Sequence, residues 1–571
     1  MNRLSRLTLT LRVSACGALL VLGACKPGGS GVSPGRTAPA ITVADARSRI
    51  FLVADDSMLG RQSGTVGNFK MTEYLGREVS RLGLEPAGEN GTYFQAVPMV
   101  RRSVDSVATT MTIDGRKLAI FTDFAPLRPN MTERYGESLS PGEFETVFGG
   151  RSGDSTGTLP ASAATGKIVI LDAPLGDNGK PTGVWGVPAN ISRSRYPTAA
   201  AIAIASLDIV TPVSLAGLRG RSTAVAQPPG PGRPAAFLIT PQVAERIIGG
   251  RLSTASRGTA GKRVGAALRF IDQPVDFPAR NVIAIVRGTD PALKDEYVAI
   301  GAHSDHVGIA ARPVEHDSLR SYYRVMRPEG AQRRGAQPTD PTPAQWARIR
   351  ASIDSLRRLR PPRLDSISNG ADDDGSGSVA LLEIAEYLAS APRPKRSILL
   401  IWHTAEEGGL LGSAWFTTFP TVPRSSIVAQ LNMDMVGRGA ADDIVGGGPR
   451  YLQVIGSRSL SSDLGKVIDS VNQRTNAYTI DRAWDAPGHI MQRYCRSDHF
   501  NYARRGIPIA FFSRGYHSEY HVVTDEPQYI NYEGLAKVAG FIRDIGVALA
   551  NRDDRPRLDR PVQNPLLPCR Q

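Results

Sequence analysis

The sequence predicts an α/β protein with a mostly parallel central sheet flanked by helices and a small β-rich domain inserted in the chain. From Asn281 onward, continuous apolar runs alternate with helical patterns, which is typical of parallel strands buried on both faces. Between about residues 136 and 268, shorter apolar runs are separated by turn-rich segments, which indicates a small module of its own. The length of 571 residues fits two or three domains, because domains usually hold about 100 to 200 residues.

Each predicted element follows from a local pattern. A helix is predicted over residues 71–82, because its pattern stops at Gly83, a residue that often ends helices. The inserted module has apolar runs at 167–171, 199–205 and 235–240. The large region that follows has predicted helices at 376–390 and near Leu411, and predicted strands at NVIAIV (281–286), YVAIGA (297–302), ILLIW (398–402), IVAQLNM (427–433) and GIPIAFF (506–512).

These patterns divide the chain into six predicted segments. They are a signal sequence (1–24), a linker (25–45), the N-terminal part of a large domain (46–135), the inserted module (136–268), the rest of the large domain (269–552) and a tail (553–571). Within the large domain, residues 311–365 carry 12 Arg against 6 Asp and Glu, and we expect a surface insertion that is helical around 343–359.

The N-terminus has the features of an export signal. Three arginines precede an apolar run from Val13 to Leu22 that is too short to span the hydrocarbon of a membrane, about 30 Å thick. The run ends in Leu-Gly-Ala-Cys25, which resembles the lipobox of bacterial lipoproteins, where the cysteine receives a lipid. Lys26 follows, and without an Asp there an outer-membrane or surface location is favoured. The expectation is an exported, lipid-anchored protein of the cell envelope, with plain secretion as the alternative.

Composition excludes several classes of protein. Hydrophobic residues at 41% and charged residues at 21% exclude a wholly disordered, fibrous or polytopic membrane protein. The net charge of +14 is spread along the chain without basic runs interleaved with aromatic residues, so nucleic-acid binding is not expected. After loss of Cys16 and lipidation of Cys25, Cys495 and Cys569 remain, either as one disulfide or as two free thiols.

Candidate metal ligands gather at the ends of the predicted strands. All eight histidines lie between residues 303 and 521. His303 and Asp305 follow YVAIGA, the pair Glu406 and Glu407 follows ILLIW, and Asp434 follows IVAQLNM. Because ligands bind at the carboxyl ends of parallel strands, these side chains are predicted to meet in one crevice.

A further group of carboxylates, Asp372 to Asp374, precedes the helix predicted at 376–390. Adjacent buried carboxylates repel each other, and a bound cation removes that cost. Nitrogen and oxygen ligands without a thiolate suit zinc first, with manganese or cobalt next. Two ions sharing one carboxylate would lie roughly 3.5 to 4 Å apart and could clamp the atoms of a hydrolysis, with Glu406 free to act as general base.

At these residues the sequence resembles the M28 family of dinuclear zinc peptidases, over roughly Arg280 to Ala550 without the Arg-rich insertion. The motifs are GAHSDHVG (301–308), GADDDGSG (370–377), TAEEGGLLGS (404–413), LNMDMVG (431–437) and YHVVTDE (520–526). The resemblance implies two zinc ions bridged by Asp373, one held by His303 and Asp434 and the other by Glu407 and His521. It further implies that Asp305 orients the His303 ring, that Glu406 is the general base, and that Tyr520 stabilises an oxyanion.

Three other histidines are weighed against these ligands. His517 is the rival for the last ligand, but the spacing from His521 to Asp525 matches the family better. His499 and His306 are interpreted as structural, or as neighbours of ligands. The module at 136–268 resembles the protease-associated domain often inserted in this family, and the Arg-rich insertion departs from the family's usual short link.

The sequence therefore predicts an exported metallopeptidase that acts on peptides or proteins, with an aminopeptidase preferred. One alternative is a carboxypeptidase of the same fold, in which an arginine of the insertion binds the substrate carboxylate. A cyclase acting on N-terminal glutamine is a further alternative, although it uses one metal. A metal-binding surface lipoprotein without turnover is the alternative from another class, and Glu406 separates it from the enzymes because a binding protein needs no free carboxylate beside the metals. The oligomeric state is not predicted.

Overall fold

The structure is a computed structural model. It describes residues 37–127, 138–154, 157, 159–175, 179–181, 195–226, 234–331, 340–489, 491–562 and 569. The predicted signal sequence, Cys25 and the linker up to residue 36 lie outside these ranges. Within them, no helix combines the length and the apolar character that crossing a membrane requires.

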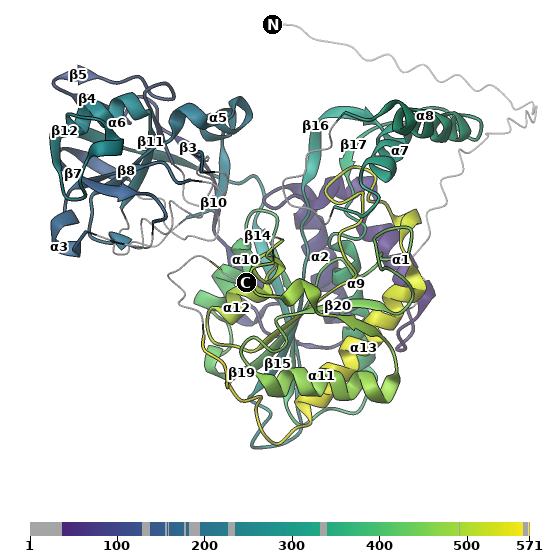
Figure 1. Cartoon of the computed structure of the whole chain (residues 1–571). Helices are drawn as coiled ribbons and strands as arrows, with labels where there is room; N and C mark the ends of the chain where they lie inside the picture. Colours follow the sequence, from purple (N-terminus) through teal and green to yellow (C-terminus); the bar gives the residue numbers. More distant parts are fainter. Residues whose placement is uncertain are drawn as a thin grey trace, which may run out of the picture. The chain divides into compact units, whose positions relative to one another are not determined.

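The large domain is built on a nine-stranded sheet with the order β1-β14-β18-β15-β19-β22-β20-β21, in which β2 also pairs with β14 (Figure 1). Its strands are β1 (Glu85–Pro86), β2 (Phe94–Val97), β14 (Ala279–Val286), β15 (Tyr297–His303), β18 (Ser397–His403), β19 (Ile427–Met433), β20 (Tyr451–Ile455), β21 (Thr479–Asp481) and β22 (Ile509–Ser513). Four of the five predicted apolar runs of this region lie within strands of the sheet, and the fifth, 506–512, overlaps β22 from Ile509 onward.

The sheet is parallel at its centre and again in the edge pair of β20 and β21. Strands β18, β15, β19 and β22 run parallel to their neighbours in that order, whereas β14 and β20 join the group antiparallel. The prediction of a mostly parallel sheet is therefore correct for the strands that carry the candidate ligands and wrong for the run 281–286. The reason is the short link from β14 to β15, because a parallel crossover normally needs a dozen or more residues.

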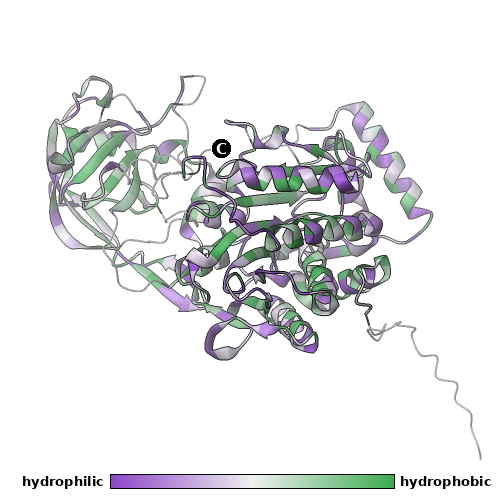
Figure 2. Ribbon diagram, turned by 90° about the horizontal axis from the view of Figure 1, so that it is seen from below, coloured by the Kyte–Doolittle hydropathy of each residue, from purple (hydrophilic) through white to green (hydrophobic). Residues whose placement is uncertain are grey.

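Successive residues of the central strands face opposite sides of the sheet. On β14, Val282 and Ala284 belong to one core cluster, while Ile283 and Ile285 belong to another on the other face. All four are fully or almost fully buried. Figure 2 shows these strands coloured mainly as hydrophobic and the flanking helices in mixed colours. Burial of both faces explains why the strands read as continuous apolar runs rather than alternating ones.

Helices cover both faces of this sheet. Those packed in the first cluster present apolar residues at helical spacing, as Met71, Leu75 and Val79 do on α2. Helix α9 begins at Gly375, where the Asp374 side chain accepts a hydrogen bond from the Gly377 N–H. The first face holds α1 (Val43–Val53), α2 (Val66–Arg81), α9 (Gly375–Ser390), α11 (Ser462–Thr475) and α13 (Tyr532–Ala550), and the other face holds α10 (Leu411–Thr418) and α12 (His499–Ala503).

The inserted module contains an eight-stranded sheet with the order β5-β4-β12-β7-β8-β9-β11-β6. This sheet starts at Thr110, earlier than the predicted boundary at residue 136, because the first strands are short and lack a long apolar run. Its strands are β4 (Thr110–Ile113), β5 (Arg116–Lys117), β6 (Phe124–Pro126), β7 (Leu139–Arg151), β8 (Ile168–Asp172), β9 (Ala201–Ala205), β11 (Ala235–Ile239) and β12 (Ala260–Leu268), and its helices are α3 (Ala161–Ala164), α5 (Pro212–Arg219) and α6 (Pro241–Ile248). A separate small sheet holds β3 (Met99–Val104), β10 (Ser222–Val225) and β13 (Phe270–Pro274).

The Arg-rich insertion is a strand pair that carries two helices. Strands β16 (Gly308–Glu315) and β17 (Leu364–Ser368) pair antiparallel, and helices α7 (His316–Met326) and α8 (Pro343–Arg357) lie between them in the chain (Figure 1). Helix α8 begins with a capping box, in which Thr342 and Gln345 satisfy each other's backbone N–H groups. The predicted helix at 343–359 corresponds to α8, and α7 was not predicted.

The two remaining cysteines form a disulfide. Cys495 and Cys569 are joined, with their Cα atoms 5.8 Å apart, so of the two states left open by the sequence the structure adopts the bonded one. The bond fixes the C-terminal tail to the loop before α12.

Candidate metal centre

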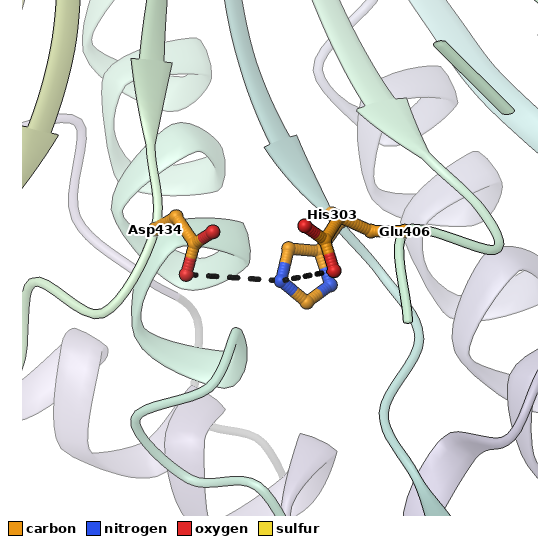
Figure 3. A group of neighbouring side chains, drawn as sticks. All are labelled: His303, Glu406 and Asp434. Carbon is orange, nitrogen blue, oxygen red and sulfur yellow. Dashed lines mark ion pairs between the residues drawn. The ribbon is translucent and has the colours of Figure 1, made fainter. Parts of the chain in front are cut away.

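The first half of the centre lies at the ends of two adjacent parallel strands. His303 is the last residue of β15, and Asp434 directly follows β19. The His303 Nε2 atom lies 3.8 Å from Asp434 Oδ1 and 4.0 Å from Glu406 Oε2. Figure 3 shows the imidazole of His303 between these two carboxylates. The sheet therefore brings to His303 two carboxylates that follow it by more than 100 residues in the chain.

Asp373 joins this half to a second half. One of its oxygens, Oδ1, lies 3.3 Å from His303 Nε2, and the other, Oδ2, lies 3.0 Å from His521 Nε2. His521 Nε2 is also 3.0 Å from Glu407 Oε2. The side chain of Asp373 thus faces both imidazoles at once, which is the placement that a carboxylate shared by two ions requires. The structure brings all five predicted ligands to one place.

The neighbours of Asp373 have different partners. Asp374 accepts hydrogen bonds from the backbone N–H groups of His303, Gly377 and Met435. The N–H groups of residues 372 and 373 donate to Asp525, which the sequence analysis did not identify as part of the site. Of the three adjacent carboxylates, only Asp373 therefore points between the histidines.

Asp305 positions the loop that carries the two glutamates. Its carboxylate accepts hydrogen bonds from the backbone N–H groups of Glu406 at 3.0 Å and Glu407 at 3.3 Å, and from the Ser63 hydroxyl at 2.8 Å. The His303 Nδ1 atom lies closer to the Asp305 backbone carbonyl, at 3.1 Å, than to its carboxylate, at 3.6 Å. The contact with the ring that the resemblance implies is thus made mainly through the backbone.

A buried arginine lies beneath the aspartate loop. Arg61 is 1% exposed and donates hydrogen bonds to the carbonyl groups of Val53, Asn369 and Gly370. Burial lowers the pKa of Arg61, and the surrounding aspartates, including Asp525 and Asp373, oppose that shift. Its charge offsets part of the negative charge of the site.

The pKa values of the two histidines are shifted because they lie among several carboxylates. Burial lowers the pKa of His303, but Glu406 and the neighbouring aspartates outweigh it and raise the pKa well above its ordinary value. Burial also lowers the pKa of His521, but Glu407 and Asp373 outweigh it and raise the pKa to about 10. The two imidazoles therefore attract protons strongly in the protein without metal, as positions suited to cations do.

The carboxylates fall into two groups. Burial would raise the pKa of Asp373, but the histidines facing it hold that pKa well below its ordinary value. Burial raises the pKa of Glu406 well above its ordinary value, and the charges of Glu407 and Asp434 add to this. Asp498 is also fully buried, which raises its pKa to about 7. Burial also raises the pKa of Asp374 well above its ordinary value, so Glu406 and Asp374 are both carboxylates of the centre that tend to hold a proton.

These residues fit a pair of metal ions. Among the described residues, His303 Nε2 and Asp373 Oδ2 are buried atoms without a hydrogen-bond partner, although both face other candidate ligands. Such atoms are costly to leave unsatisfied, and coordination of a cation would satisfy them. Two imidazoles with three carboxylates form a nitrogen and oxygen donor set that suits zinc.

Tyr520 lies on the loop beside His521. Its ring stacks on Tyr516 with centroids 4.6 Å apart and on His521 at 3.8 Å. Burial raises its pKa well above the ordinary value, so the hydroxyl keeps its proton. The Arg496 guanidinium donates to this hydroxyl at 3.4 Å, and its charge also acts on Glu406 and Asp434. Arg496 is a further residue that the sequence analysis missed, because nothing local distinguishes it from other arginines.

The other histidines take different positions. His517 faces Asp372 Oδ2 at 3.4 Å and Asp525 Oδ1 at 3.7 Å, and neither of these carboxylates is one of the five predicted ligands. His499 is buried and stacks on Phe511 with centroids 4.6 Å apart. Burial lowers its pKa to about 3, so it stays neutral in the core.

The Arg-rich insertion contacts the loop that carries His521. Arg320 of α7 lies 2.6 Å from Glu519, which also pairs with Arg438 at 2.9 Å. His316 lies 3.2 Å from Glu526, to which Arg363 also donates. Both glutamates are buried, whereas the Arg363 side chain is 50% exposed. The insertion is thus attached on both sides of His521.

The comparisons with known proteins match this part of the chain. Residues 281–545 match the model of peptidase family M28. This domain belongs to peptidase family M28. The matched residues include β15, β18 and β19, whose ends carry candidate metal ligands, and they also include the Arg-rich insertion.

Curated relatives of the M28 domain include enzymes named leucine aminopeptidase 1. That of Aspergillus fumigatus is 27% identical over 216 residues, which are 35% of this chain and 52% of the relative. That of Sclerotinia sclerotiorum is 34% identical over 169 residues, 28% of this chain and 41% of the relative. The chain spans about half the length of the curated relatives it matches.

Similar solved structures include two aminopeptidases of lower sequence identity. An aminopeptidase from Aneurinibacillus sp. strain AM-1 is 17% identical with a TM-score of 0.43, over 92% of this chain and 98% of the other. A zinc aminopeptidase from Bacillus subtilis, BSAP, is 17% identical with a TM-score of 0.41, over 89% and 95%.

Proposed function

We propose that this protein is a zinc-dependent aminopeptidase that removes N-terminal residues from peptides or proteins with two zinc ions per chain. The observation that carries the proposal is the meeting of five side chains of suitable chemistry around Asp373, with Glu406 left over beside them. The M28 match and the names of the relatives support the same reading. A site that only stores metal would have no use for the additional buried carboxylate.

In this proposal His303 and Asp434 would hold one ion, Glu407 and His521 would hold the other, and Asp373 would contribute to both positions. When bound, the zinc ions supply Lewis-acid chemistry that lowers the pKa of water and polarises the scissile carbonyl. Manganese or cobalt could take the same ligands. Asp305, Asp374 and Asp525 hold the ligand-bearing loops through backbone N–H groups.

Glu406 acts as the general base and then as the general acid. Its carboxylate takes a proton from the attacking water and returns it to the leaving amine, which requires a group that can hold a proton near neutral pH. The burial that raises its pKa supports this role. The Tyr520 hydroxyl, kept protonated and contacted by Arg496, can donate a hydrogen bond to the oxygen that becomes negative in the transition state.

The location of the enzyme is part of the proposal. The N-terminal pattern supports export and attachment to the cell envelope through a lipid on Cys25, with the outer membrane favoured and plain secretion as the alternative. The disulfide between Cys495 and Cys569 supports an oxidising compartment. Detection of a lipid-modified N-terminal cysteine by mass spectrometry tests it, and an unmodified mature N-terminus contradicts it.

Carboxypeptidase activity is the second candidate function. The observation that favours it is Arg496, a half-buried cation beside Tyr520 whose guanidinium could bind a terminal carboxylate. Cleavage of a mixed peptide library with mass readout separates the two activities. We expect loss of N-terminal residues, abolished by a chelator and restored by zinc. Loss of C-terminal residues would contradict the aminopeptidase and support the carboxypeptidase. No cleavage at all would favour a metal-binding protein without turnover.

A further inference from the structure

His306 contacts the metal centre without being one of its five predicted ligands. The residue is fully buried, and its Nδ1 atom lies 2.9 Å from Glu407 Oε1. The same atom is 3.7 Å from Asp373 Oδ2, a longer distance than a hydrogen bond allows. Glu407 is therefore bounded on one side by His306 and on the other by His521, which lies 3.0 Å from Oε2.

The imidazole of His306 has little freedom to move. Its backbone N–H donates to the Arg61 carbonyl at 3.3 Å, and its ring lies edge-on to His521 with centroids 5.6 Å apart. Gly370, at φ +57°, lies against the ring so closely that a Cβ there would be 2.5 Å from two ring atoms. The backbone of residues 61 and 370 thus fixes the direction in which Nδ1 points.

The surroundings also determine which nitrogen carries the proton. Within the described residues, His306 Nε2 is buried without a hydrogen-bond partner. A buried N–H group without a partner is rarer than an unpaired acceptor, so the proton belongs on Nδ1. Nδ1–H then donates to Glu407 Oε1, which acts as the acceptor.

We propose that His306 is a positioning residue that occupies Oε1 of Glu407, so that Glu407 binds metal through Oε2 alone. The inference rests on the proposed two-metal function. With its hydrogen bond to His306, Glu407 has one oxygen fixed and the other directed to the position that it shares with His521 and Asp373. Groups that orient ligands in this way typically change metal affinity by about 10- to 100-fold.

The test compares two variants of almost equal size. In His306→Asn the amide N–H₂ can replace Nδ1–H, whereas His306→Leu removes the donor and keeps the volume. We expect His306→Leu to bind its second zinc ion about 10- to 100-fold more weakly than wild type, with the first ion unaffected. His306→Asn should recover most of that affinity. Competition titration with a chromophoric chelator and the metal content per chain measure both quantities without reference to activity.

Cobalt substitution adds a readout that a purely structural role would not change. The visible spectrum of cobalt at the second position should change in His306→Leu, because the released Glu407 can bind through both oxygens, and should return in His306→Asn. His403→Asn is the matched control: His403 is equally buried at the end of β18, but its partner is the Tyr502 hydroxyl at 3.1 Å. This control should keep the wild-type affinity for both ions.

Three results would overturn the inference. They are a His306→Leu variant that binds both ions as wild type does, a His306→Asn variant as weak as His306→Leu, and equal weakening at both positions. Wild-type protein that never holds a second ion contradicts the proposed two-metal function itself and the inference with it. Wild type with two ions and an unaffected His306→Leu variant overturns the role of His306 alone.

Discussion

The two halves of the metal centre are held in different ways. His303 and Asp434 sit at the ends of adjacent parallel strands and are 1% and 5% exposed. His521 belongs to a loop, its side chain is 35% exposed, and its backbone has a φ of +61°. The sheet holds the first half through its own hydrogen bonds, whereas the second half depends on contacts from His306, the insertion and Arg438. We therefore expect the first half to be the more rigid and the tighter metal site.

The largest expected effect comes from Glu406, which faces His303 in the first half and is not one of the five proposed ligands. Glu406→Gln should lower turnover on a peptide substrate by at least ~10²-fold, because the proposed general base is lost. Its metal content should stay near that of wild type, since the five ligands are untouched. Steady-state kinetics and metal analysis check both. Unchanged turnover would show that Glu406 is not the base.

Removal of a ligand from each half tests the comparison directly. His521→Ala should lose the second ion and keep the first, because the strand ends still place His303, Asp434 and Asp373. His303→Ala should weaken both ions, since Asp373 loses the partner that fixes its Oδ1 atom. Metal content after dialysis against a weak chelator measures this. If both variants lost both ions equally, the expectation that the two halves of the centre bind metal independently would be wrong.

The pH dependence of metal binding follows from the raised pKa of His521, about 10 in the metal-free protein. Below that pH a metal ion must displace a proton, so affinity should fall by up to about tenfold per pH unit as the pH falls, for each proton displaced. Competition titrations between pH 6 and 9 check this, and an affinity independent of pH would contradict it.

The same pKa predicts the stability of the metal-free protein. A raised pKa favours the folded, protonated form, so this stabilisation is complete below the ordinary histidine pKa of 6.5 and is lost as the pH rises toward 10. The Tm of metal-free wild type should therefore fall over this range more than that of metal-free His521→Ala.

The smallest expected effect concerns the insertion. Arg320→Ala removes a partner of buried Glu519 and should weaken the second ion by about threefold to tenfold, less than loss of a direct ligand contact. Arg324→Ala is the control, because its partner Asp442 is 72% exposed and such surface pairs contribute little. If both variants bind metal alike, the contact through Arg320 does not support the His521 loop.

Part of this site could be predicted because its information is local. His303, Asp434 and the two glutamates each follow an apolar run, and the strand in front of each is visible in the sequence. The antiparallel direction of β14 and the start of the inserted sheet at Thr110 were not visible, because strand direction and short strands depend on which segments pair.

The sequence by itself determined the kinds of ligand, the strands that carry them and the M28 resemblance. Only the tertiary structure decided which groups surround those ligands. Arg61 donates to Gly370 across 309 positions, and His306 meets Glu407 across 101. Apolar periodicity and motif spacing depend on residues that are close together in the chain. These contacts, in contrast, form only when the sheet has assembled and its loops have packed together.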